Sequence, residues 1–71
     1  MFQTVQGRKV YVVDLPELPT LPVHAGTEPE LANYAKALTH AIENGIIMQP
    51  GKYAIEIYGP TSEQYNIFAV I

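Results

Sequence analysis

Two histidines, His24 and His40, are the side chains of this sequence best suited to titrate near neutral pH or to bind a metal ion. A zinc site needs three or four ligands at short spacings, and neither a His-x-x-x-His pair nor a carboxylate cluster accompanies them. His40 follows Lys36 by one helical turn, so we expect its side chain to lie in solvent. The sequence therefore predicts no metal site.

Residues for nucleophilic or cofactor chemistry are equally sparse. Ser62 lies in a polar segment with no histidine nearby and no Gly-x-Ser-x-Gly context. The sequence contains no cysteine and neither of the glycine-rich loops that bind nucleotides. Asp14 and Glu17 stand close together, but such carboxylate pairs are common and usually solvated. We expect no catalytic residue, no cofactor and a protein that is not an enzyme.

Length and charge narrow the choice of partners. Seventy-one residues predict a single small α+β domain, residues 1–71, with a marginal core of its own. Four Lys and Arg side chains and a formal net charge of −3 do not supply the clustered cations that nucleic-acid binding requires. No apolar run is long enough for a membrane span, and the first residues do not resemble a signal peptide. With no cysteine present, a cytoplasmic protein is expected, with neither nucleic acid nor membrane as partner.

The helix signals are the clearest in the chain. Thr27 is a good N-cap, Glu30 completes a Thr-x-x-Glu capping box, and Asn44-Gly45 tolerate the left-handed dihedrals that end a helix. These signals predict a helix over about residues 28–44. Its apolar residues form one stripe at helical spacing, so the helix should pack by one face: Leu31, Tyr34, Ala35, Leu38, Ala41 and Ile42.

Strand-forming runs lie on both sides of the helix. Residues 9–14 are mostly β-branched and aromatic, residues 52–58 alternate between faces, and residues 65–71 are almost wholly apolar. Residues 2–5 predict a shorter strand, joined to residues 9–14 by a turn at Gly7. The expected fold class is α+β, with one helix packed on a three- to four-stranded, mostly antiparallel sheet, ordered ββαββ or, without the first strand, βαββ.

The last strand is apolar on both faces, and one helix can cover only one face of a sheet. If Tyr58 pairs with Tyr65, the face away from the helix carries a continuous apolar patch of the kind that marks an interface. A shift of one residue in register would exchange the faces of this strand. The interface residues predicted from the Tyr58–Tyr65 pairing are Tyr58, Tyr65, Ile67, Ala69 and Ile71.

A proline-rich segment is the alternative cover for that face. Prolines recur at every third position within residues 15–23, which predicts an extended strap of polyproline-II type. Leu15, Leu18 and Leu21 then lie on one side of it. The strap either covers the apolar face of the sheet or binds a partner.

These observations predict a small non-catalytic binding protein, a homo-oligomer that regulates or inhibits another macromolecule. Its expected partners are a second copy of itself and another protein. The alternative is a protein that binds or sequesters a small, nucleotide-like molecule in a pocket between protomers, lined by Arg8, Lys9, Lys52, Tyr58 and Tyr65. The sequence identifies neither the partner or ligand, nor the pathway, nor the number of subunits.

Overall fold

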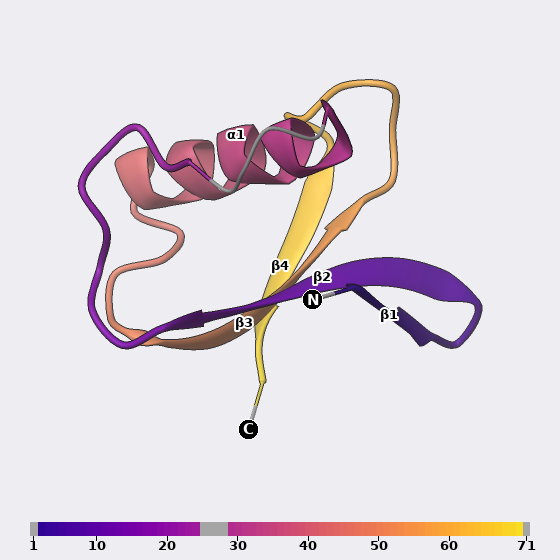
Figure 1. The fold of residues 1–71 in the computed structure, drawn as a ribbon, viewed down its shortest axis with the longest axis horizontal. Helices are drawn as coiled ribbons and strands as arrows, with labels where there is room; N and C mark the ends of the chain where they lie inside the picture. The colour runs from indigo at the N-terminus through magenta and orange to yellow at the C-terminus, as the bar shows by residue number, and fades with distance from the viewer. Residues whose placement is uncertain (1, 25–28, 71) are drawn as a thin grey trace.

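The computed structural model describes residues 2–24 and 29–70 and contains one helix packed on one four-stranded sheet. The helix, α1 (Pro29–Glu43), lies across a single face of the sheet (Figure 1). Every neighbouring pair of strands is antiparallel, and the strand order in space equals the order in the chain. The strands are β1 (Phe2–Val5), β2 (Arg8–Leu15), β3 (Gly51–Ile57) and β4 (Tyr65–Ala69). The predicted α+β fold is confirmed, with the first strand present.

A tight turn fixes the β1–β2 hairpin. Gln6 and Gly7 have φ angles of 51° and 77°, and positive values at both central positions are typical of the type I′ turns that match the twist of a hairpin. The ring of Phe2, the first residue of β1, lies on the helix side of the sheet and packs against two tyrosines. The Phe2 ring centroid lies 5.0 Å from that of Tyr11 and 5.3 Å from that of Tyr34.

The helix ends in a Schellman motif, as the Asn44-Gly45 pair predicted. Gly45 has a φ of 73°, where a residue without Cβ is favoured. Its N–H donates to the carbonyl of Ile42 at 3.2 Å, and the N–H of Ile46 donates to the carbonyl of Ala41 at 2.8 Å. At the other end of the helix, the predicted cap Thr27 and the expected first residue Glu28 lie outside the described residues.

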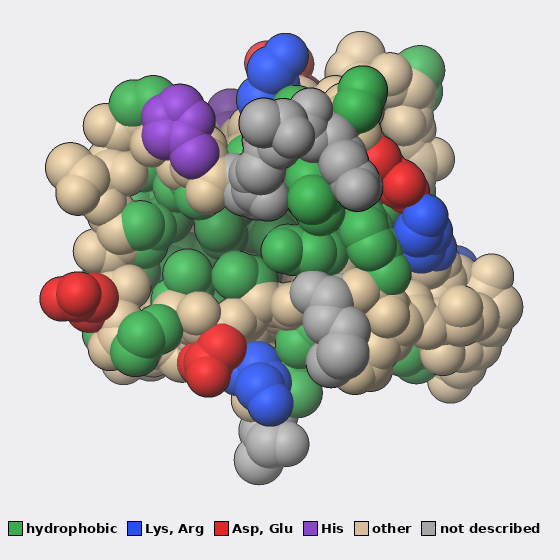
Figure 2. Space-filling model, viewed as in Figure 1, with side chains coloured by type: hydrophobic (Ala, Val, Ile, Leu, Met, Phe, Trp, Pro, Cys, Tyr) green, Lys and Arg blue, Asp and Glu red, His purple; other side chains and the backbone are tan. Residues whose placement is uncertain are grey.

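The core lies between α1 and the sheet, and it is wider on the helix than the predicted stripe. Ala37 is fully buried, although the stripe left it out, while Leu31 is only half-buried. Ile55 at the centre of β3 is also fully buried, and Ile47 from the α1–β3 loop is nearly so. Figure 2, which looks between the two layers, shows the hydrophobic side chains gathered there in a hollow.

The register between β3 and β4 differs from the predicted one by one residue. Tyr65 pairs with Ile57 rather than with Tyr58, and Ile67 pairs with Ile55. Tyr65 and Ile67 therefore lie on the face beneath α1, where both pack against the core. Ala69 shares that face by alternation. Their predicted placement on the face away from the helix is wrong, because side chains alternate and a shift of one residue exchanges the faces of the whole strand.

The proline-rich strap runs beside α1, on the helix side of the sheet. The N–H of Val23 donates to Thr39 Oγ1 at 2.8 Å, and that hydroxyl donates in turn to the carbonyl of Ala35 at 2.9 Å. Val23 also packs against the core, whereas Leu18 and Leu21 are exposed. The strap thus contributes to the layer that already covers the sheet, and it does not cover the opposite face.

We predict that Leu38→Ala lowers the free energy of unfolding by about 2–5 kcal/mol, because it leaves a cavity beneath the helix. Leu38 is almost fully buried in the core. Chemical denaturation followed by circular dichroism measures the change. Lys36→Ala, on the exposed side of the same helix, should stay within about 0.5 kcal/mol, and an equal loss in both variants would contradict the described packing.

Candidate functional site

The sheet face opposite α1, here called the open face, is an uncovered surface of the described chain that combines apolar and charged side chains. Its apolar members come from all four strands and from the residue after β4: Val5, Val10, Val12, Ala54, Phe68 and Val70. Its polar members lie at the two ends: Gln3, Arg8, Asp14, Lys52, Glu56, Tyr58 and Asn66. No described element packs over this face, because both the helix and the strap lie on the other side.

The open face is hollowed into a groove of about 580 Å³. Val10 and Ala54 form its floor and are each 3% exposed, since strand neighbours surround these small side chains. Phe68 and Val70 form one wall and are 47% and 37% exposed. A large aromatic side chain with half its surface in water beside an apolar floor is typical of a binding surface.

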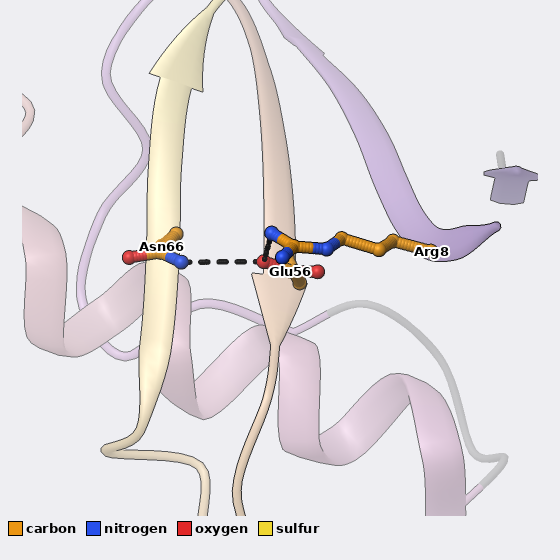
Figure 3. A network of polar contacts seen from close by, with 3 residues as sticks. All are labelled: Arg8, Glu56 and Asn66. Atoms are coloured by element: carbon orange, nitrogen blue, oxygen red, sulfur yellow. Dashed lines mark hydrogen bonds and ion pairs between the residues drawn. The ribbon is translucent and has the colours of Figure 1, made fainter. Parts of the chain in front are cut away.

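A buried carboxylate lies on the open face beside one end of the groove. Glu56 is 8% exposed and lies on β3 between two neighbouring strands. Its Oε1 atom is 3.5 Å from Arg8 Nη1 and accepts a hydrogen bond from Asn66 Nδ2 at 3.2 Å, as Figure 3 shows. Burying a carboxylate is costly unless it is paired, so these two partners hold the charge in place.

The charges of the open face cancel. Arg8 and Lys52 oppose Glu56 and Asp14, and Asp14 lies directly opposite Lys52 in the β2–β3 register. The formal charge of −3 on the whole chain therefore comes from residues outside this face. An apolar groove with neutral ends suits a protein surface and gives a phosphate backbone no cationic patch.

The predicted interface residues divide between two places. Tyr58 lies on the open face beside Arg8 and is strongly exposed. Tyr65, Ile67 and Ala69 lie on the helix side, along the outer edge of the sheet, and Ile71 lies outside the described residues. Phe68 and Val70 alternate with these residues along the strand, so the observed register places both on the open face.

The residues predicted to line a small-molecule pocket are also dispersed. Arg8 and Tyr58 lie together at one end of the open face, and Lys52 lies at the other end. Lys9 is on the helix side, where its Nζ pairs with Glu30 and lies 4.4 Å from the Phe2 ring centroid. Tyr65 contacts the helix. Within one protomer the five side chains do not form a common pocket.

His40 is half-buried rather than solvent-exposed, which corrects the prediction from sequence. Its Nδ1 atom lies 2.6 Å from the Tyr65 hydroxyl, and the two rings meet edge to face. Burial raises the pKa of Tyr65, so the hydroxyl stays protonated at neutral pH and donates when His40 carries its proton on Nε2. This contact ties the C-terminal part of α1 to the first residue of β4.

Both histidines border a second groove, of about 460 Å³, between the strap and α1. Lys36, Glu43 and Ser62 also line this groove, so its rim carries charges of both signs. Among the residues that the structure describes, no three His, Cys, Asp or Glu side chains lie close enough together to hold a metal ion. Ser62 borders the groove with no hydrogen bond to either histidine in the described part of the chain.

Comparison with protein-family models, with curated proteins and with solved structures gave no match to this chain. Among the described residues, no helix has both the length and the hydropathy that crossing a membrane requires.

We predict that Asn66→Ala lowers the free energy of unfolding by about 1–2 kcal/mol, because Glu56 then keeps a buried charge with one fewer donor. Arg8→Ala should cost less than about 1 kcal/mol, because the Arg8 side chain is 70% exposed and its pairing is screened by water and salt. Urea denaturation at low and high salt measures both. A larger loss for Arg8→Ala than for Asn66→Ala would contradict this ranking.

We predict that His40→Ala and Tyr65→Phe each lower the free energy of unfolding by about 1 kcal/mol, because each removes one partly buried hydrogen bond. The double variant should lose less than the sum of the two, since both changes break the same contact. A double-mutant cycle from thermal or urea unfolding measures this coupling. Additive losses would mean that the contact contributes nothing to stability.

Proposed function

We propose that this chain is a small non-catalytic binding protein whose open face docks on another protein and thereby regulates or inhibits it. The observation that supports the proposal is the apolar, charge-neutral groove that no described element covers. A domain of this size leaves much of its surface exposed, so burying Phe68 and Val70 against a partner adds apolar burial that its own chain does not provide.

The chemistry of the groove favours a protein as the partner. Its cations, Arg8 and Lys52, each face an acid, so little positive potential remains to attract nucleic acid. Its centre is apolar and its ends are polar, which is the arrangement of an interface core and rim. We further propose that the protein acts in the cytoplasm, because its chain contains no cysteine. We also propose that it is a homo-oligomer, because a domain of this size gains stability from assembly.

A small apolar molecule is the second candidate for the groove. Its volume of about 580 Å³ falls within the roughly 300–1,000 Å³ usual for ligand pockets. Such a ligand would lie on Val10 and Ala54 and reach Glu56 or Lys52 with a polar group. Mass spectrometry of the protein denatured directly after purification would detect it.

We expect Val70→Asp and Phe68→Asp to abolish capture of the partner protein, because each places a charge in the wall of the groove. The matched control is Leu18→Asp, because Leu18 on the strap and Val70 on the open face are both 37% exposed. The measurement is cross-linking in a lysate of the source cells followed by mass spectrometry, with circular dichroism to verify folding.

A protein captured by the wild type and by Leu18→Asp, but lost with both groove variants, would support the open face as the binding surface. If the wild type and all three variants captured the same proteins in equal amounts, the open face would not be the binding surface.

A further inference from the structure

The outer edge of β4 lacks the charged residue, the proline and the bulge that commonly protect an edge strand. β4 is the last strand in the sheet order, and no described strand lies beyond it. Edge strands normally carry a lysine, a proline or a bulge that hinders the addition of another strand. Residues 65–70 contain no charged residue and no proline, and all of β4 pairs regularly with β3.

The outward backbone groups of β4 belong to alternate residues. The carbonyl of Gln64 accepts from the N–H of Tyr58 at 2.9 Å, and the N–H of Val70 donates to the carbonyl of Lys52 at 2.8 Å. Even-numbered residues of this segment therefore direct their backbone groups toward β3. Because the direction alternates along an antiparallel strand, Tyr65, Ile67 and Ala69 direct their N–H and C=O groups outward.

A groove of about 470 Å³ lies beside this edge. Met48 and Ile46 of the α1–β3 loop line it together with Ile67 and Ala69 of β4. Met48 is 77% exposed, the highest value among the large hydrophobic side chains of the described chain. A strand added to β4 would cover these side chains as well as the outward backbone groups.

We propose that β4 pairs antiparallel with β4 of a second copy, so that the two sheets become one continuous sheet. This inference rests on the proposed function, whose homo-oligomer it specifies. A two-fold axis near Ile67 places Ile67 opposite the partner's Ile67, and both residues direct their backbone groups toward each other. The same axis places Tyr65 opposite the partner's Ala69, so a large side chain meets a small one on the helix side.

No charged side chain opposes a second copy at this edge. Two chains of formal charge −3 repel each other, and residues 65–70 contribute none of that charge. The partner's Tyr65 also comes next to Ala69 and hence beside Met48, where a thioether and an aromatic ring attract each other. The helices of both copies stay on one side of the joined sheet, and the two open faces form one wider surface on the other.

Ala69→Pro tests the pairing directly. Proline removes the outward N–H of Ala69, which bonds to nothing within the protomer's own sheet, so the fold should tolerate it at this edge position. Ala69→Ser keeps the N–H and a small side chain and is the matched control. Light scattering at micromolar concentration should give twice the 7.9 kDa chain mass for the wild type and for Ala69→Ser, and the single-chain mass for Ala69→Pro.

Amide hydrogen exchange provides the second readout. On dilution below the dimer dissociation constant, the amides of Ile67 and Ala69 should lose protection, while those of Phe68 and Val70 should keep it. A dimer that persists in Ala69→Pro, or exchange of Ile67 and Ala69 that does not change with concentration, would overturn the pairing. A monomeric wild type would also overturn it, and it would leave the proposed function standing if Val70→Asp still abolished capture of the partner.

Discussion

One helix covers one face of this sheet, and the pairing of β3 with β4 decides which residues lie beneath it. Ile55 is fully buried at the centre of that face and lies directly opposite Ile67, so both belong to the core under α1. Since side chains alternate along each strand, this single pair determines the face on which each remaining residue of the two strands lies. Phe68 and Val70 are left on the side that no described element covers.

The open face combines apolar side chains with one buried, paired charge, and this combination favours specific binding. Its centre is small and aliphatic, and its one buried charge, Glu56, is held by Arg8 and Asn66 from the neighbouring strands. A paired carboxylate of this kind contributes little net stability, but it gives the groove a defined polar end. A partner must therefore match both an apolar floor and a polar boundary, which favours specific binding over general adhesion.

Tyr65 links α1 to the outer edge of β4. Its hydroxyl contacts His40 on α1, and its backbone groups point outward from β4. The contact fixes the first residue of the edge strand against the helix. The proline strap adds to the same layer through Val23 and Thr39 and thereby leaves the open face free.

The sequence by itself determined the secondary structure, the α+β class and the Schellman motif at Gly45 that ends the helix, because these depend on local periodicity and on capping residues. It also determined that one face of the sheet would lack a helix. Only the tertiary structure decided which residues occupy that face, since the β3–β4 register places Ile67 opposite Ile55 in the core beneath α1. The Arg8–Glu56–Asn66 network and the His40–Tyr65 contact arise for the same reason, because each joins residues that are distant in sequence and become neighbours only once the register is set.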